Sequence, residues 1–151
     1  MKNILILFLS LSVYFGYSQE GYNHINLACG YTTQSIQQFS VAFEFNNSYY
    51  NSWEFIFEAN RNLDLKEDIY QGGVVYEPLI LKSNNFLFNF RAGFLMGSSS
   101  GDFLLSGVGG LELSYTFPGL FVIMLQQNNQ YIINIEDRFR ASMLFGVKIP
   151  I

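Results

Sequence analysis

The chain has few of the residues that build common catalytic and metal sites. Of its 151 residues, one is cysteine and one is histidine. The single cysteine, Cys29, excludes a disulfide within the chain. The single histidine, His24, excludes metal sites built from several histidines, and a Ser-His-Asp arrangement would have to use that one residue. We interpret His24 as an ordinary interior or rim histidine, and we expect no enzyme activity, no metal and no cofactor.

Charged side chains and long apolar runs are also scarce. Charged residues make up 13% of the chain and aromatic residues 18%, whereas soluble domains carry roughly 25% charged residues. The formal net charge is −4 and no basic patch is present, so we expect no direct contact with nucleic acid. Beyond residue 20, no apolar run approaches the ~20 residues that a membrane-spanning helix needs. The apolar residues instead alternate with polar ones, which indicates strands.

The alternation is clearest at the end of the chain, from Arg138 to Ile151. One face of this segment carries Phe139, Ala141, Met143, Phe145, Val147, Ile149 and Ile151. The other face carries three cations, Arg138, Arg140 and Lys148. A strand of a soluble sandwich could have this pattern, but alternation up to the last residue is typical of an outer-membrane barrel. We therefore expect the last strand to close a barrel against the first.

Segments of the same kind, separated by turn residues, fill the rest of the chain. Together with the last segment they predict an all-β, eight-stranded antiparallel up-and-down transmembrane barrel, because eight strands of ~10 residues and their links account for its length. Pro78 predicts a bulge or an early end of pairing in the fourth strand. The other seven strands are expected at residues 23–31, 39–45, 53–60, 69–81, 86–96, 103–117 and 120–127.

The links between the expected strands alternate in length. Shorter links, at 46–52, 82–85 and 118–119, follow the second, fourth and sixth strands. Longer links, at 60–68, 97–102 and 128–137, follow the third, fifth and seventh. Short periplasmic turns and longer external loops are typical of outer-membrane barrels. Aromatic residues near the short links, among them Trp53, Tyr115 and Phe117, predict an interfacial girdle.

The predicted inward face carries acids and bases in similar numbers. An eight-stranded barrel is filled by side chains, so unpaired charges inside it would be costly. We interpret these residues as a lumen charge network that fills the barrel, in preference to an ion or proton path. Its expected members are Glu44, Glu54, Glu58, Glu77, Arg91, Glu112, Arg138, Arg140 and Lys148. The glycines between Gly107 and Gly110 predict close packing or strand curvature.

Residues 1–19 have the features of a signal peptide that is cleaved on export. Lys2 precedes an apolar core at 4–13, and a more polar exit follows, with cleavage expected near Ser18 or Gln19. An N-terminal membrane anchor is the alternative. Residues 20–151 would then form a single outer-membrane barrel domain. Cys29 follows a polar stretch instead of the apolar core, so we expect a buried or lipid-facing thiol and no lipidation.

Several of these segments resemble the conjugative transposon TraO family, small outer-membrane proteins of conjugation systems in Bacteroidetes. The resemblance lies in the last strand, with Phe139, Gly146, Lys148 and Ile151, in G-G-L-E-L-S-Y-T-F at 109–117, and in F-x-F-x-x-G at 88–93. Together with the segment from Gln71 these motifs cover most of residues 53–151. The family tends to have an arginine-glutamate-arginine cluster after the seventh strand, where this chain has Gln127, Asn128 and Asn129.

The resemblance implies a non-enzymatic barrel of the outer membrane that is a component of a conjugative transfer apparatus. Its expected partners are outer-membrane lipid and other proteins of that apparatus. The alternative is a stand-alone barrel of the porin-like superfamily that binds a ligand or partner through the loops at 60–68 and 128–137. A third class, an enzyme embedded in the membrane, has no supporting set of residues.

Overall fold

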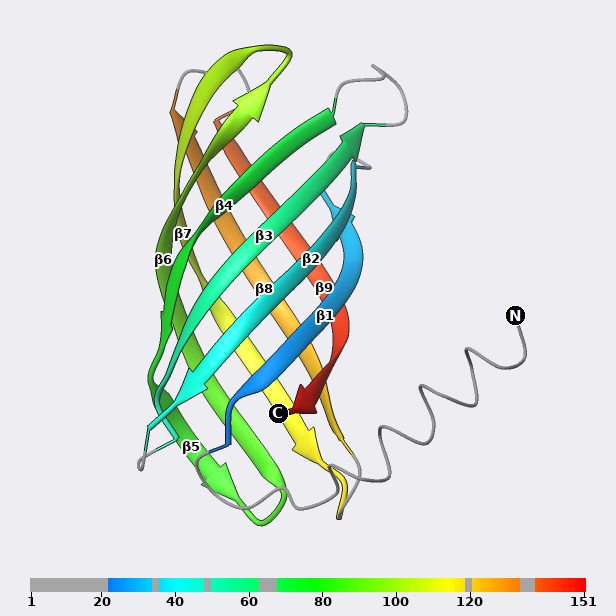
Figure 1. Cartoon of the computed structure of the whole chain (residues 1–151), viewed down its shortest axis with the longest axis vertical. Coiled ribbons are helices and arrows are strands. Elements are labelled where there is room, and N and C mark those ends of the chain that lie inside the picture. The colour runs from blue at the N-terminus through cyan, green and yellow to red at the C-terminus, as the bar shows by residue number, and fades with distance from the viewer. Residues whose placement is uncertain (1–21, 34–35, 48–49, 63–67, 119–120, 134–137) are drawn as a thin grey trace, which may run out of the picture.

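The protein is described here by a computed structural model that covers residues 22–33, 36–47, 50–62, 68–118, 121–133 and 138–151. The expected signal peptide lies outside these residues. They form strands that wind around one axis into a barrel (Figure 1). No helix among them is both long and apolar enough to cross a membrane. The strands are β1 (His24–Thr32), β2 (Ile36–Asn46), β3 (Ser52–Asn62), β4 (Asp68–Glu77), β5 (Leu79–Ser83), β6 (Phe86–Ser99), β7 (Asp102–Thr116), β8 (Val122–Ile133) and β9 (Phe139–Pro150).

The barrel is closed by the pairing of its first and last strands. The sheet order is β4-β3-β2-β1-β9-β8-β7-β6-β5, and β4 also pairs with β6. The antiparallel pairing of β1 with β9 confirms the expected closure. β4 and β5 pair with successive parts of β6 and together occupy one strand position. The nine strands therefore form an eight-stranded barrel. The break between β4 and β5 lies at Pro78, with a register shift between Leu79 and Leu81, as the proline predicts.

The expected alternation of loop lengths is wrong. β6 and β7 continue past the predicted ends, so the expected link at 97–102 shrinks to Ser100 and Gly101. These residues have φ values of 51° and 96°, and positive φ at both central positions is typical of the tight hairpin turns that match strand twist. The links at 47–51 and 117–121, where short turns were expected, are longer than this one.

β8 is also longer than predicted. The amide-rich residues Asn128–Gln130 were assigned to a loop, but they lie within β8, which ends at Ile133. Its pairing with β7 and β9 runs without a break through these residues. The external loop expected at 128–137 is therefore partly strand, and residues 134–137 lie outside the described part of the chain. Likewise, residues 60–62 of the loop expected at 60–68 belong to β3.

The outer wall is apolar and rich in aromatic residues. On β2 and β3, Phe43, Phe55 and Phe57 are each half exposed or more, while the residues between them are buried. Aromatic rings gather at the end of the barrel where β1 begins and β9 ends, which we call the termini end. Here Trp53 lies 4.8 Å from Tyr76, and Tyr115 lies 4.7 Å from Phe86 and 4.8 Å from Phe117, measured between ring centroids. This is the girdle that the sequence predicts, and the wall suits a bilayer.

A lysine on this wall should destabilise the barrel according to its depth. Phe145→Lys places an ammonium group near the middle of β9, where we expect a loss of ~2–4 kcal/mol, whereas the same change at Ile151, beyond the end of the strand, should cost about 0–1 kcal/mol. Unfolding midpoints in denaturant for the protein folded into lipid vesicles would measure both values. Equal losses at the two positions would contradict the membrane-spanning orientation of β9.

Candidate functional site

The inward side chains form alternating polar and apolar layers along the barrel axis. Proceeding away from the termini end, β2 presents Glu44, Ala42, Ser40, Gln38 and Ile36 to the interior. The inward residues of β4 follow the same order, with Glu77, Val75, Gly73, Gln71 and Ile69. Because strands in register repeat the sequence of layers, each layer continues around the barrel. A charged layer therefore lies near the termini end, with an apolar layer directly behind it.

Arg91 is the centre of the charged layer. Its side chain is fully buried and contacts carboxylates from three other strands. Nη2 lies 2.7 Å from Glu54 Oε2, Nη1 lies 3.2 Å from Glu112 Oε2, and Nη1 also pairs with Glu77 Oε1. A guanidinium can hold several carboxylates because its five N–H donors are fixed in one plane. Arg91 thus links β3, β4 and β7 across the lumen.

Lys148 holds the other side of the same layer. Its Nζ lies 2.6 Å from Glu44 Oε2 and 2.6 Å from Glu112 Oε1, and 3.7 Å from Glu77 Oε2. Glu112 contacts both Arg91 and Lys148, so the two cations belong to one network. The network joins the terminal strand β9 to β2, β4 and β7 through side chains, in addition to the backbone pairing of the sheet.

Uncharged side chains complete the hydrogen bonds of these carboxylates. Ser114 Oγ and Gln126 Nε2 donate to Glu112 at 2.6 Å and 2.9 Å. Ser52 Oγ donates to Glu77 at 3.2 Å. Asn26 Nδ2 donates to Glu44 Oε2 at 2.9 Å and also to Glu54 Oε1. These partners were not predicted from the sequence, because contacts across a barrel depend on register and stagger.

Three of the expected members of the network lie elsewhere. Glu58 is buried in the polar layer farther from the termini end, where its Oε2 accepts a hydrogen bond of 2.6 Å from Gln130 Nε2. Arg140 is buried on the inward face of β9. Arg138 precedes β9 and is exposed. The contiguous network therefore contains Glu44, Glu54, Glu77 and Glu112 with Arg91 and Lys148.

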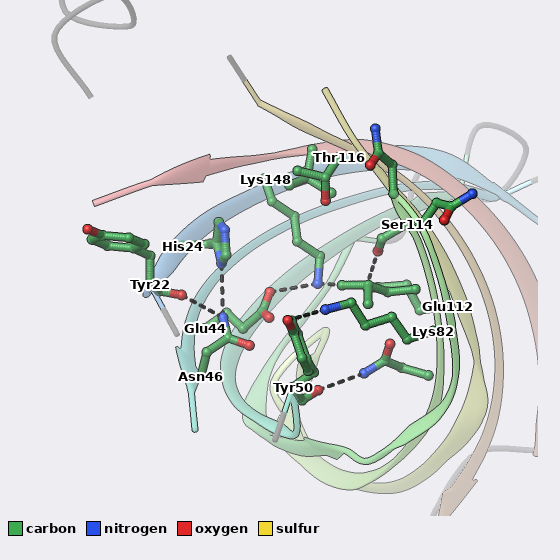
Figure 2. Close-up of a pocket in the computed structure, with 15 residues that line it drawn as sticks. Tyr22, His24, Glu44, Asn46, Tyr50, Lys82, Glu112, Ser114, Thr116 and Lys148 are labelled. Atoms are coloured by element: carbon green, nitrogen blue, oxygen red, sulfur yellow. Dashed lines mark hydrogen bonds and ion pairs between the residues drawn. The ribbon is translucent and has the colours of Figure 1, made fainter. Parts of the chain in front are cut away.

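A cavity opens from the termini end toward this network. It has a volume of about 280 Å³, and Glu44, Glu112 and Lys148 contribute to its lining. Figure 2 shows Lys148 reaching between Glu44 and Glu112, with His24 and Asn46 beside them. His24 Nδ1 lies 3.0 Å from Asn46 Nδ2, so His24 belongs to the rim of the cavity, as its sequence position predicts. Lys82 lies over the Tyr50 ring, 3.8 Å from its centroid.

A second hollow interrupts the apolar outer wall on β6, β7, β8 and β9. We call this hollow the wall recess; it has a volume of about 560 Å³. A Cβ atom added to Gly107 or Gly109 would meet no other atom within 4 Å, so these outward glycines leave the backbone uncovered. The glycine-rich segment was expected to give close packing or strand curvature, and at these two residues the structure shows no close packing. The recess is rimmed by Phe90, Leu111, Tyr131 and Phe139.

Two amide side chains line the wall recess. Gln127 and Asn129 alternate with the buried residues of β8 and pair in register with outward residues of β7 and β9. Gln127 Nε2 donates to Asn129 Oδ1 at 3.0 Å, and Asn129 Nδ2 to Gln127 Oε1 at 3.4 Å. On the described outward face, the other amide and charged side chains, Gln37, Arg61 and Asp68, lie near strand ends. The sequence carried this signal, because outward alternation continues through Leu125, Gln127, Asn129 and Tyr131.

Comparison with known proteins places the fold. No family model and no curated protein matches the sequence. The solved structure of the outer membrane enzyme PagL is similar, with a TM-score of 0.61 and 13% identity over 85% of this chain and 99% of PagL. The Yersinia pestis outer membrane protein Ail is also similar, with a TM-score of 0.57 and 14% identity over 87% of this chain and all of Ail. The chain has the fold of a small outer-membrane barrel. At this identity the likeness concerns the fold alone.

Removal of Arg91 should be much more costly than removal of its neighbour on the inward face of β6. Arg91→Leu leaves the buried carboxylate of Glu54 without its cation and leaves Glu77 only Lys148 at 3.7 Å, which should cost roughly 3–5 kcal/mol. Asn89→Leu removes two long hydrogen bonds to backbone carbonyls, a loss of about 1 kcal/mol. Denaturant unfolding of the two variants in the same detergent would measure the difference. Similar midpoints would mean that Arg91 does not stabilise the barrel through these carboxylates.

Proposed function

We propose that the protein is a non-enzymatic structural component of a conjugative transfer apparatus in the outer membrane. In this proposal it is held there by its apolar wall and docks to a neighbouring membrane-embedded protein of the apparatus through the wall recess. The assignment to conjugation rests on the resemblance to the TraO family in the terminal strand and in residues 88–93 and 109–117. The docking rests on the chemistry of the recess.

The amides of Gln127 and Asn129 carry the proposal of a docking surface. Each carboxamide has two N–H donors and an oxygen with two lone pairs, and their mutual hydrogen bonds use only part of that capacity. Hydrocarbon chains offer no partner for the remainder. A neighbouring protein in the membrane can supply one, and small residues such as Gly107 and Gly109 allow its backbone to approach closely.

The filled lumen supports a structural role in preference to a conduit. Arg91 and Glu54 are fully buried and joined at 2.7 Å, and Lys148 extends the same network to β9. Behind it, the apolar cluster of Ala42, Ile56, Val75, Leu95 and Val108 fills the next layer. Eight-stranded barrels are just wide enough for such side chains. Neither DNA nor a solute of ordinary size would pass while these layers are in place.

The chemistry of the wall recess supports a non-enzymatic role as well. The carboxamides of Gln127 and Asn129 neither titrate nor act as nucleophiles near neutral pH, so they suit recognition more than catalysis. Their neighbours in the recess are glycine backbone and apolar rings. Such a surface can bind a partner through hydrogen bonds and close packing.

Filling the wall recess should impair conjugation without unfolding the barrel. In a donor strain whose own copy of the gene is deleted, Gly109→Leu should lower the transfer frequency by about tenfold or more, which corresponds to roughly 1.4 kcal/mol of lost association. Gly72→Leu is the matched control. Gly72 faces outward on β4, where an added Cβ would make only ordinary contacts at 3.6 Å and 3.8 Å. Heat-modifiable migration in gels would verify that both variants are folded in the outer membrane.

Two results would contradict the proposal at different points. Unchanged transfer after deletion of the gene would reject the role in conjugation. A normal transfer frequency for Gly109→Leu, in cells where deletion abolishes transfer, would reject docking through the wall recess while leaving the role in conjugation intact.

A further inference from the structure

The cavity at the termini end leaves open space between the charged layer and the mouth of the barrel. Its volume of about 280 Å³ lies just below the roughly 300–1,000 Å³ of sites that hold drug-sized ligands. A water molecule occupies roughly 30 Å³ in the liquid, so the cavity has room for a ligand of the size of a single sugar ring. Figure 2 shows the ends of Tyr50, Lys82 and Lys148 directed into this space.

The charges on the lining of this cavity balance. Among the described residues that line it, the charged ones are Glu44, Glu112, Lys82 and Lys148, and His24 is neutral at pH 7. Lys148 pairs with both carboxylates at 2.6 Å, so neither acid is left to neutralise a ligand. A cation in the cavity would lie beside the two lysines, and an anion beside the two acids. The lining therefore favours a ligand without net charge.

The neutral side chains of the lining supply hydrogen-bond acceptors. Asn46 Nδ2 donates to Tyr22 O at 2.7 Å, which leaves Oδ1 of the same carboxamide as an acceptor. Asn89 Nδ2 donates to two backbone carbonyls and likewise keeps its oxygen. Ser114 Oγ gives its one proton to Glu112 and keeps its lone pairs. A ligand that satisfies these groups has to bring several donors.

A donor and apolar surface lie beside these acceptors. The Tyr50 hydroxyl accepts a hydrogen bond from Lys82 Nζ, so its own O–H remains to donate. Leu87 and Val122 line the same cavity with apolar side chains. Hydroxyl groups both donate and accept, and a sugar ring carries several of them around a carbon frame. Such a ring matches the mixture of groups on the lining.

We propose that the cavity at the termini end is a binding site for one sugar ring without net charge. The carboxamide oxygens of Asn46 and Asn89 accept hydrogen bonds from the sugar hydroxyls, and the Tyr50 hydroxyl donates one. The ion pairs of Lys148 exclude charged relatives of the same sugar. This site was not predicted from the sequence, because its side chains come from β2, from β6 and from the turn between β2 and β3.

The proposal is tested by solution NMR on the isotope-labelled protein folded in dodecylphosphocholine, a detergent without a sugar headgroup. At pH 7, at least one of glucose, galactose and N-acetylglucosamine should shift the side-chain amide signals of Asn46 and Asn89 in a saturable way. Glucosamine and glucuronate, which carry one charge on the same ring, should bind at least about fivefold more weakly than the neutral sugar. Stronger binding of maltotriose than of glucose would identify the end of a glycan chain as the ligand, and stronger binding of glucose a free sugar.

Three variants locate the site. Asn46→Ala removes one acceptor and should weaken sugar binding by about fivefold, the equivalent of one hydrogen bond. Asn60→Ala is the matched control, because Asn60 is buried inside the barrel but does not line the cavity. Lys82→Met removes one cation from the lining, so glucosamine should gain several-fold in affinity relative to glucose.

Absence of saturable shifts with all three neutral sugars at about 100 mM, which would fill a site with a millimolar Kd, would overturn the proposal. Equal binding of glucose, glucosamine and glucuronate would also overturn it, because the balanced lining would then select nothing. Equal weakening by Asn46→Ala and Asn60→Ala would place the sugar elsewhere. If Asn46→Ala does not fold, the comparison of charged and neutral sugars on the unaltered protein and on Lys82→Met decides.

Discussion

Closure of the hydrogen-bonded sheet is the constraint on which the rest of the structure depends. In hydrocarbon, a backbone N–H or C=O group without a partner costs several kcal/mol, so a sheet with free edges cannot span a bilayer. The pairing of β1 with β9 and of β4 with β6 removes those edges. Pro78 has no N–H to contribute to the sheet. Beyond the proline, β5 continues the pairing with β6 that β4 began. Once the eight-stranded barrel is closed, the width of the lumen is set and every inward side chain must fit inside it.

The layered interior follows from that narrow width. Inward side chains from opposite walls meet, so a charge on one strand must find its partner on another. Arg91 meets carboxylates of β3, β4 and β7, and Lys148 meets those of β2, β4 and β7. The apolar layer behind these pairs excludes water and so strengthens them, while it also makes any uncompensated charge more costly. The same confinement therefore both strengthens the ion pairs and raises the cost of losing one.

Alternation in the sequence predicted the eight strands of the barrel, the pairing of β9 with β1, and which side chains point inward or outward. It could do so because side-chain direction along a strand has a period of two. It could not predict which inward charges meet, since partners such as Arg91 and Glu54 are 37 positions apart and depend on register and stagger. Loop lengths were wrong where polar residues continue a strand. Ser98 and Ser99 in β6 and Asn128–Gln130 in β8 keep their place in the sheet through backbone hydrogen bonds, which side-chain polarity does not reveal. Arg138 and Arg140 fell outside the network because they lie at the other end of the last strand from Lys148.

The wall recess is the place where the chain departs most clearly from the pattern of the rest of the barrel. An outer-membrane barrel requires apolar residues outside and compensated charges inside. Gln127 and Asn129 break the first requirement on β8, next to glycines that leave the wall uncovered. The second is met even where Glu44 lies opposite Glu54, because Lys148 pairs with Glu44 and Arg91 pairs with Glu54. In the proposed docking, a neighbouring protein supplies the hydrogen-bond partners that hydrocarbon cannot offer to the amides of Gln127 and Asn129. Departures from local consistency are expected at functional sites, and two amides beside bare glycine backbone suit a partner that forms hydrogen bonds and packs closely.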